Sequence, residues 1–393
     1  MPAYDSLAHP VRHIPGDPDT DSPEEGIALC LSGGGFRAML FHTGALWRLN
    51  ELGYLARLER ISSVSGGSIA AGVLALAWKD LEFDDATGVA ARFPELVGEK
   101  LIGLTGHTID VESVLVGMAL PGQSISERVA HAYRKLLYGR ASLQDLPPEP
   151  APTFVFNSTS LQTGVLFRFS RAYMADYLVG RVENPDFPLA EAVAASSAFP
   201  PVLSPSVHDV SSYEFVAGSG HDPSLGQAPY TTRLVLSDGG VYDNLGLETA
   251  WKKCKTILVS DGGGEMPPAP EPPGDWARLS VRVMKTIDNQ VRSLRKQQVI
   301  EGYKSSLRDG TYWGIRSHMA DYPAPSELEF DQDATEALAN YPTRLGEVDP
   351  QMRNRLINWG YAICDAAMRS HVDKDGQARA AEFPREGGVI GAP

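Results

Sequence analysis

Short apolar runs alternate with glycine-rich turns and amphipathic segments in the first part of the chain. The pattern predicts a strand at residues 27–31 and a helix from about residue 36 to 52. A second strand is predicted at residues 60–64. The helix expected next, from residue 66 to about 78, is apolar nearly all round, which is typical of a helix buried within a fold. This strand–helix–strand–helix order predicts a βαβ unit with a parallel sheet.

The rest of the chain predicts further strands and helices, and no linker separates two cores. We expect a single domain over residues 25–371, with residues 80–146 as a helical insertion and candidate lid, and residues 267–273 as a Pro-rich surface loop. Residues 1–24 are expected to form a flexible leader and residues 372–393 a disordered tail. The other predicted elements are strands at 153–158, 165–170, 233–237 and 256–260, and helices near 188–196, 276–303 and 350–369.

Composition excludes several classes of partner. The 393 residues are 43% hydrophobic, enough for a sizeable core, and the formal net charge is -14. This charge argues against nucleic acid as a partner, because phosphate binding needs clustered Lys and Arg. It also argues against general adhesion to anionic membranes. The predicted helix 276–303 is locally basic and would suit anionic lipid, although a charge-rich helix is more often a solvated face.

Cysteine usage and the N-terminal sequence favour a cytoplasmic protein. The three cysteines are far apart and form no C-x-x-C pair, so we expect neither a disulfide framework nor a zinc site. The polar, Pro-rich N-terminus lacks the apolar core of a signal peptide. The longest apolar stretch, residues 69–78, is shorter than the roughly 20 residues that span a bilayer. The sequence leaves open whether this cytoplasmic protein also binds peripherally to membranes.

The glycine row Gly33-Gly34-Gly35 lies where the first strand meets the first helix. Backbone N–H groups at a helix start suit an anion, either a phosphate or a developing oxyanion. The Walker A motif fails, because Phe36-Arg37-Ala38 stands where Gly-Lys-Ser/Thr is needed. The dinucleotide pattern G-x-G-x-x-A fits, but Glu59 comes too early for the acidic residue it requires. A glycine-rich turn without a ligand is the remaining alternative.

The segment Ser63-Val64-Ser65-Gly66-Gly67 approximates the nucleophile elbow G-x-S-x-G. Ser63 replaces the first glycine of the motif, and Gly67 is retained; both positions require a small side chain, because strand and helix pass close together there. An acyl serine hydrolase also needs N–H donors near its nucleophile, often from a neighbouring loop, and the glycine row offers them. Ser65 is therefore the candidate nucleophile.

A serine hydroxyl needs a base to become a good nucleophile. His318 and His371 come late in the chain, where a Ser–Asp–His order would place a histidine, whereas His42 is interpreted as structural or solvent-facing. Two aspartates are the other candidates. Asp238 and Asp261 each follow a predicted strand and precede two glycines, although either is also compatible with an ordinary Asp-Gly turn.

Four segments, in this order, resemble the patatin-like phospholipases, which include the cytosolic phospholipase A enzymes. The resemblance covers roughly residues 27–260, and the helix with Trp359-Gly360-Tyr361 also resembles a C-terminal helix of bacterial members. The segments are Ser32-Gly33-Gly34-Gly35-Phe36-Arg37, Ser63-Val64-Ser65-Gly66-Gly67, Ala195-Ser196-Ser197-Ala198-Phe199-Pro200 and Asp238-Gly239-Gly240-Val241-Tyr242-Asp243-Asn244.

The resemblance implies an α/β fold, a three-layer α/β/α sandwich with a mainly parallel central sheet, and a Ser–Asp dyad without histidine. It implies Ser65 as nucleophile and Asp238 as base, since only Asp238, and not Asp261, precedes Val-Tyr-Asp-Asn. The oxyanion hole would be Gly33, Gly34 and Gly35. Arg37 would contact a phosphate head group, or else serve as a structural arginine. Ser63 and Ala38 depart from the family pattern.

The function expected from the resemblance is a serine-dependent lipid acyl hydrolase that cleaves carboxylic ester bonds of phospholipids or related lipids through an acyl-enzyme. We expect no metal and no cofactor. Two alternatives stay open: a Ser–Asp–His esterase of a non-lipid ester, and a non-catalytic lipid- or nucleotide-binding protein on the same scaffold. Residues 111–120 are interpreted either as a lid or acyl-contact segment or as core.

Overall fold

The computed structural model describes residues 24–109, 124–218, 220–373 and 380–389 of the chain. The candidate lid or acyl-contact segment 111–120 and the expected leader, except for its last residue, lie outside the described residues.

A mixed sheet of ten strands runs through the described part of the chain in the order β10-β9-β1-β2-β3-β4-β5-β6, with β8 pairing with β3 and β7. The half from β10 to β3 is parallel, and the pairs beyond β3 are antiparallel. The strands are β1 (Glu24–Leu31), β2 (Arg60–Ser63), β3 (Thr153–Ser160), β4 (Leu166–Phe169), β5 (Tyr173–Asp176), β6 (Gly180–Glu183), β7 (Ser206–Asp209), β8 (Arg233–Asp238), β9 (Cys254–Asp261) and β10 (Asp309–Gly314).

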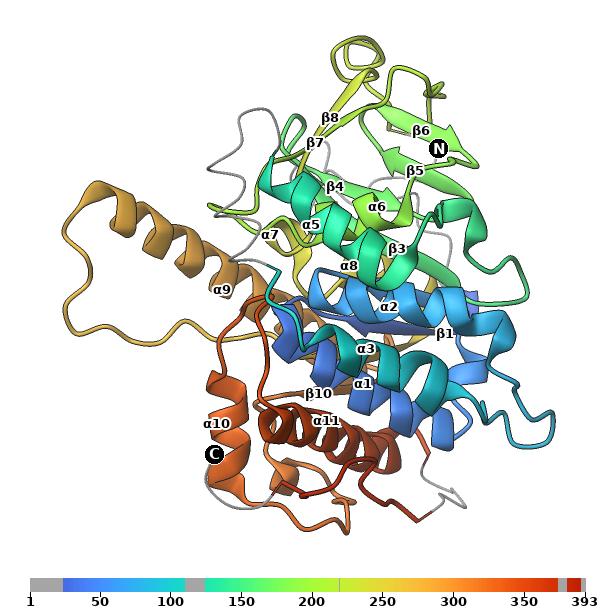
Figure 1. Cartoon of the computed structure of the whole chain (residues 1–393), viewed down its shortest axis with the longest axis vertical. Coiled ribbons are helices and arrows are strands. Elements are labelled where there is room, and N and C mark those ends of the chain that lie inside the picture. The colour runs from blue at the N-terminus through green and yellow to red at the C-terminus, as the bar shows by residue number, and fades with distance from the viewer. Residues whose placement is uncertain (1–23, 110–123, 219, 374–379, 390–393) are drawn as a thin grey trace.

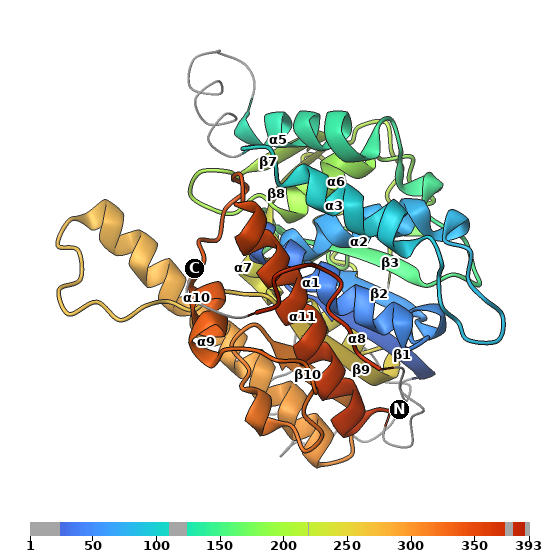
Figure 2. The same ribbon diagram turned by 60° about the horizontal axis from the view of Figure 1, so that its bottom comes forward.

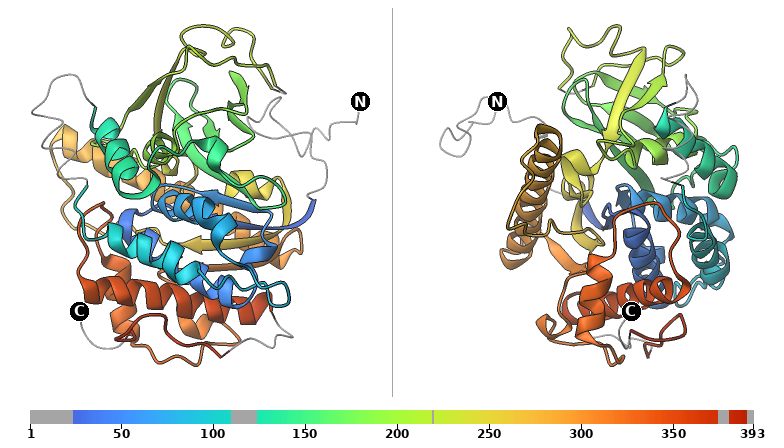
Figure 3. Two further views of the ribbon diagram at one scale, coloured as in Figure 1. Left: turned by 45° about the vertical axis from the view of Figure 1, so that its right-hand side comes forward. Right: turned by 60° about the vertical axis from the view of Figure 1, so that its left-hand side comes forward.

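Helices cover both faces of the parallel half, as Figures 1 and 3 show. They are α1 (Gly35–Glu51), α2 (Gly66–Ala77), α3 (Glu99–Leu104), α5 (Ile125–Tyr133), α6 (Leu189–Ser196), α7 (Gly240–Asp243), α8 (Leu247–Trp251), α9 (Trp276–Lys304), α10 (Gln332–Asn340) and α11 (Pro350–His371). Short 3₁₀ or π turns lie at Leu55–Arg57, Trp78–Asp80, Pro94–Gly98, Arg134–Tyr138, Leu143–Asp145 and Met319–Asp321.

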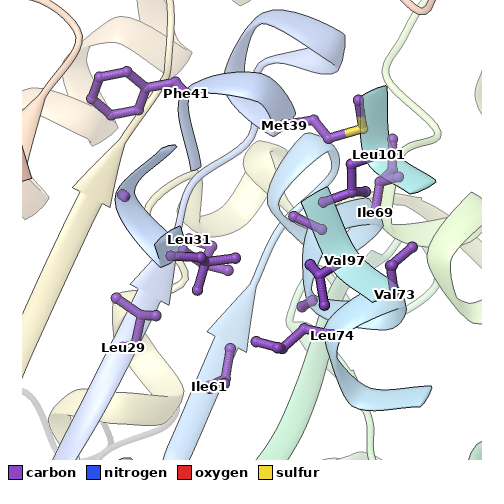
Figure 4. Packing of buried hydrophobic residues seen from close by; sticks show 14 of the residues in the cluster. Leu29, Leu31, Met39, Phe41, Ile61, Ile69, Val73, Leu74, Val97 and Leu101 are labelled. Atoms are coloured by element: carbon purple, nitrogen blue, oxygen red, sulfur yellow. The ribbon is translucent and has the colours of Figure 1, made fainter. Parts of the chain in front are cut away.

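The side chains of β1 show why the fold has three layers. Successive residues of a strand point to opposite faces of the sheet. Leu29 and Leu31 belong to the large core beneath α1, α2, α3 and α11, whereas Ala28 and Cys30 belong to a smaller core beneath α8 and α9. Figure 4 shows the first of these cores. The three-layer α/β/α architecture is thus confirmed.

The helices α1 and α11 lie side by side and approach each other at two glycines (Figure 2). A Cβ atom on Gly360 would lie 1.9 Å from the carbonyl oxygen of Phe41, and one on Gly44 would lie 1.8 Å from that of Ile357. Only glycine allows two helix backbones this close. This contact fixes α11 against the helix that follows the glycine row.

The predicted unit β1–α1–β2–α2 is confirmed, with ends shifted by at most three residues. The strands β5, β6, β7 and β10 and the helix α10 are not predicted by the apolar pattern. Residues 206–209, for which no element is predicted, form β7, which pairs with β8. The described residues of the helical insertion 80–146 form short helices and turns, among them α3 and α5.

The C-terminal residues 380–389 pack against α11. The Nδ2 group of Asn358 donates hydrogen bonds to the carbonyl oxygens of Arg385 (2.9 Å) and Gly388 (3.2 Å). Val389 is fully buried and forms a β-bridge with Phe330. In residues 380–389 this packing differs from the disorder that the sequence predicts, because the buried amide of Asn358 supplies the backbone partners that a polar segment lacks by itself.

Candidate active site

Ser65 stands on a sharp turn between β2 and α2. Its backbone angles are φ 50° and ψ −115°, a conformation that non-glycine residues rarely adopt. Such strain costs on the order of 1–3 kcal/mol and persists only where the surroundings enforce it. Here the N–H of Ser65 donates a hydrogen bond of 3.0 Å to the hydroxyl of Ser196. The turn therefore has the strained geometry of a nucleophile elbow.

The two small positions of the elbow are occupied in different ways. A Cβ atom on Gly67 would lie 2.3 Å from the carbonyl oxygen of Leu31, so this position requires glycine. At the other position, the hydroxyl of Ser63 donates to the carbonyl oxygen of Val155 (3.1 Å) and accepts from Ser68 (3.0 Å). The serine that departs from the G-x-S-x-G pattern is thus buried with its hydroxyl hydrogen-bonded.

Asp238, the last residue of β8, lies next to Ser65. Both residues line one cavity, and the N–H of Gly240 donates a hydrogen bond to the Oδ1 atom of Asp238 at 2.7 Å. Burial raises the pKa of Asp238 to about 7, although the Gly240 N–H and the nearby Ser65 hydroxyl act to lower it, because an ionised carboxylate is poorly solvated in the interior. A carboxylate with this pKa is suited to proton transfer near neutral pH.

Asp261, the rival base, is engaged elsewhere. Its Oδ1 accepts from the N–H of Gly263 (2.9 Å), and its Oδ2 accepts from the hydroxyl of Tyr312 (2.8 Å). Burial acts to raise its pKa, but Arg292 and Lys296, together with the hydrogen bonds from Tyr312 and Gly263, hold the pKa of Asp261 well below its usual range. Asp238 lines the cavity with Ser65, whereas Asp261 does not.

The described histidines do not line the cavity at Ser65. His42 is buried, with Nδ1 2.8 Å from the hydroxyl of Ser260 and Nε2 2.9 Å from the carbonyl oxygen of Ser32. Burial lowers its pKa to about 4, so the ring is neutral at pH 7. Its contact with Ser32 links the ring to the residue directly before the glycine row. His371, at the end of α11, packs against the ring of Tyr322.

The three glycines of the row play different parts. The N–H of Gly33 donates to the carbonyl oxygen of Asn244 (3.1 Å), which differs from the oxyanion role expected for Gly33. In the described structure, the N–H groups of Gly34, Gly35 and Gly66 have no acceptor. Gly34 lines the cavity with Ser65, and Gly66 directly follows it. The open donors are therefore those of Gly34 and Gly35 at the start of α1 and of Gly66 at the start of α2.

The cavity at Ser65 has a volume of about 240 Å³ and is open to solvent. Its wall combines apolar side chains with charges of both signs. It is lined by Gly33, Gly34, Ser65, Phe199, Asp238, Asn244, Gly264, Glu265, Met266, Pro267, Lys285, Asp288, Asn289, Arg292 and Thr343. No group of three or more His, Cys, Asp or Glu side chains in the described part of the chain is placed to hold a metal ion.

Comparison with known proteins decides the family. The model of the family described as patatin-like phospholipase matches residues 29–251, more than half of the chain. The chain belongs to the patatin-like phospholipase family. The matched region of this patatin-like protein includes Ser65 and Asp238 and ends before α9.

Solved structures with similar architecture have low sequence identity to this patatin-like protein. Human GIVD cytosolic phospholipase A2 is 14% identical (TM-score 0.39; 62% of this chain and 46% of that chain covered). Its complex with methyl gamma-linolenyl fluorophosphonate and terbium chloride gives 13% identity and a TM-score of 0.47, covering 89% of this chain and 59% of that chain. VipD from Legionella pneumophila is 14% identical (TM-score 0.36; 90% and 68% covered). The chain spans about half the length of the first of these structures, and no curated protein matches it.

Arg37 of this patatin-like protein lies behind the glycine row and does not line the cavity. Its side chain is buried, and it donates from Nε to the carbonyl oxygen of Gly262 (3.2 Å) and from Nη1 to that of Tyr341 (2.5 Å). Burial and the nearby Arg292 lower its pKa to about 10. These contacts favour the structural interpretation of Arg37 over contact with a head group.

Three residues without an assigned role hold the site together. Ser196 accepts from the N–H of Ser65, and Asn157 donates from Nδ2 to the hydroxyl of Ser62 and the carbonyl oxygen of Ser63, both at 2.9 Å. The carbonyl oxygen of Asn244 accepts a hydrogen bond from the N–H of Gly33. Ser196 and Asn244 lie within the family segments, which is a signal that could have identified them. Asn157 lies in a predicted strand and carries no such signal.

No described helix combines the length and apolar character needed to cross a bilayer.

Proposed function

We propose that this protein is a lipid acyl hydrolase that cleaves carboxylic ester bonds of phospholipids or related lipids, with Ser65 as nucleophile and Asp238 as base. Membership of the patatin-like phospholipase family supports lipid hydrolysis. The observation that carries the assignment of residues is that Ser65, on its strained turn, lines one cavity with a buried carboxylate, Asp238, whose pKa is about 7.

In the first half of the proposed reaction, Asp238 takes the proton of the Ser65 hydroxyl as Oγ attacks the ester carbonyl carbon. The carbonyl oxygen becomes an oxyanion, which accepts hydrogen bonds from the open N–H groups of Gly34, Gly35 and Gly66. The bond to the leaving alcohol then breaks, and Asp238 returns its proton to that oxygen. The product of this half-reaction is an acyl-Ser65 ester and a free alcohol.

In the second half, water attacks the acyl-Ser65 carbonyl while Asp238 again accepts a proton. Collapse of the second tetrahedral intermediate releases the carboxylic acid, and Asp238 returns the proton to the Oγ atom of Ser65. A single carboxylate can perform both proton transfers, because its pKa lies close to neutral pH. Both the protonated and the ionised form of Asp238 are then populated.

The direct test combines a fluorophosphonate probe with hydrolysis of defined phospholipids. We expect the probe to label the wild-type protein and Ser204→Ala but not Ser65→Ala. Ser204 is a suitable control because its partly buried hydroxyl is bound to Ser237 away from the cavity. Labelling that persists in Ser65→Ala would contradict the assignment of the nucleophile.

The same assays separate the alternatives. A Ser–Asp–His esterase would lose turnover in His318→Ala or His371→Ala, whereas the proposed dyad tolerates both changes. A non-catalytic lipid-binding protein would bind lipid but would neither react with the probe nor release fatty acid. Product mass analysis over a panel of neutral and anionic phospholipids would identify which ester bond is cleaved.

A further inference from the structure

Large apolar side chains are exposed along one side of α9. Trp276 is 83% exposed, Ile287 60%, Leu294 54%, Val283 50% and Leu279 41%. At 3.6 residues per turn these five positions fall on a single stripe of the helix. We call them the α9 stripe. Soluble monomers rarely expose a contiguous apolar surface of this kind without a partner.

The α9 stripe continues into an apolar groove on the body of the protein. Leu279, Val283 and Ile287 face Phe199 and Val241 across a groove of about 400 Å³. Phe199 and Val241 are themselves 36% and 39% exposed. The groove and the Ser65 cavity share Phe199 and Asp288 as lining residues, so the exposed apolar surface leads directly to the site.

Charge along α9 is opposite in sign to that of the whole protein. Residues 276–287 contain Arg278, Arg282 and Lys285 and no carboxylate, whereas the chain has a formal net charge of -14. Helical geometry places these three cations off the α9 stripe, on the other side of the helix. The N-terminal part of α9 extends beyond the body of the protein together with the loop before it (Figures 1 and 2).

We propose that the α9 stripe, with Phe199 and Val241, docks on a lipid surface that carries anionic head groups. An amphipathic helix with low overall hydrophobicity, a Trp on its apolar side and Lys and Arg on its polar side is suited to lie in the plane of a lipid–water interface. Tryptophan suits this boundary, because its ring is apolar and its N–H remains wet. The long stems of Arg282 and Lys285 allow their charges to reach phosphates above a buried stripe.

The consequence for the site rests on the proposed function. With the α9 stripe in the lipid surface, the groove past Phe199 gives a lipid a path to Ser65 that avoids bulk water. Lipids in a bilayer would then be hydrolysed through this surface, whereas a monomeric, water-soluble ester would reach Ser65 without it.

The binding experiment uses the whole 393-residue chain with Ser65→Ala, which cannot consume the lipid, and flotation with vesicles of phosphatidylcholine containing or lacking phosphatidylglycerol. We expect binding to the anionic vesicles. Trp276→Asp and Val283→Asp should each reduce the partition coefficient at least tenfold. Leu161→Asp and Leu307→Asp are matched controls, because these leucines are 50% and 55% exposed but lie outside the α9 stripe, and they should bind as the parent does.

Equal binding by the stripe variants and their parent would overturn the proposal. So would sedimentation showing that the α9 stripe mediates a dimer that does not bind vesicles, since the occupant would then be a second copy of the chain. Circular dichroism and thermal melting check that each variant is folded, which is expected because the substituted positions are exposed.

A hydrolysis experiment keeps this proposal distinct from the proposed function. In the background with Ser65 intact, the loss of rate on vesicles in Trp276→Asp should exceed any loss on a monomeric short-chain ester by at least tenfold. Stripe-dependent binding without hydrolysis of either substrate would refute the proposed function and leave the docking surface standing. Equal losses on both substrates, with unchanged vesicle binding, would refute the docking surface alone.

Discussion

The backbone N–H of Ser65 and the hydroxyl of Ser196 form a hydrogen bond of 3.0 Å between residues that are 131 positions apart in the chain. The same hydroxyl donates to the carbonyl oxygen of Asn157 (2.6 Å) and lies 2.9 Å from the hydroxyl of Ser68. One side chain thus connects the turn, the start of α2 and strand β3. This connection helps to keep Ser65 in its strained conformation.

Replacing Ser196 with alanine should weaken both the turn and the proposed reaction. The N–H of Ser65 would lose its buried acceptor, which costs about 1–3 kcal/mol of stability. We expect a lower melting temperature, and a kcat on a soluble ester reduced by about tenfold, which corresponds to roughly 1.4 kcal/mol. Ser197→Ala is the matched control, because the hydroxyl of Ser197 is bound within its own helix at Val193. Equal behaviour of the two variants would contradict this role of Ser196.

The pKa of Asp238 sets the expected pH dependence of the reaction. Only the ionised carboxylate accepts the Ser65 proton, so kcat/KM for a monomeric ester should rise with pH through a transition near 7, the pKa raised by burial. The transition should be measured on a substrate whose own ionisation lies elsewhere. A rate that is independent of pH between about 5 and 9 would argue against Asp238 as the base.

The same pKa makes a prediction about stability. At pH values between 3.8, the ordinary pKa of an aspartate, and about 7, the pKa of Asp238 in the fold, the folded protein holds a proton on Asp238 that the unfolded chain has released. Raising the pH through this window therefore favours unfolding, and above it the full penalty of roughly 4 kcal/mol is present. Asp238→Asn carries no ionisable group there but keeps an oxygen for the N–H of Gly240.

We therefore expect Asp238→Asn to gain stability over the wild type as the pH rises from about 4 to about 7, with no further gain above that range. Urea unfolding at a series of pH values measures this difference, and ionisable groups common to both proteins cancel. A difference that is constant with pH would show that the carboxyl titrates normally in the folded protein.

The close contact of α1 and α11 predicts that Gly360→Ala is strongly destabilising. The added Cβ would lie 1.9 Å from the carbonyl oxygen of Phe41, a backbone atom that moves only with its helix. Overpacking of a core costs about 1–3 kcal/mol, and a clash with backbone should lie at or above the upper end. The control is Gly103→Ala in α3, where a Cβ meets nothing within 4 Å. It should be neutral or stabilising by up to about 1 kcal/mol.

Arg37→Met separates the two interpretations of this arginine. The substitution removes the hydrogen bonds to the carbonyl oxygens of Gly262 and Tyr341, so we expect a lower melting temperature. The ratio of rates on a phospholipid and on a neutral ester should not change, because Arg37 does not line the Ser65 cavity. A selective loss of activity on the phospholipid would instead support contact with the head group.

Local periodicity is strong enough to predict the long elements but not the short ones. The helix α1 and the strand β1 each present repeated apolar positions to a core, and both are predicted within a few residues. Strands of four residues show little alternation, and of these β2 and β4 are predicted, whereas β5, β6 and β7 are not. A short strand forms where a neighbouring strand supplies its hydrogen bonds. For β7 that neighbour is β8, which comes more than twenty residues later in the chain.

The sequence by itself determined the β1–α1–β2–α2 unit, the glycine row at its first turn and the serine at its second, because each depends on short-range patterns of apolar, small and polar residues. The strand and glycine pattern alone left Asp238 and Asp261 equivalent, and only the resemblance to the family motif favoured Asp238. The tertiary structure supplies the physical difference between them. Tyr312 from β10 and Arg292 from α9 engage Asp261, whereas pairing of β8 with β3 carries Asp238 to Ser65. The order of strands in a sheet is set by packing over the whole chain, and no local pattern encodes it.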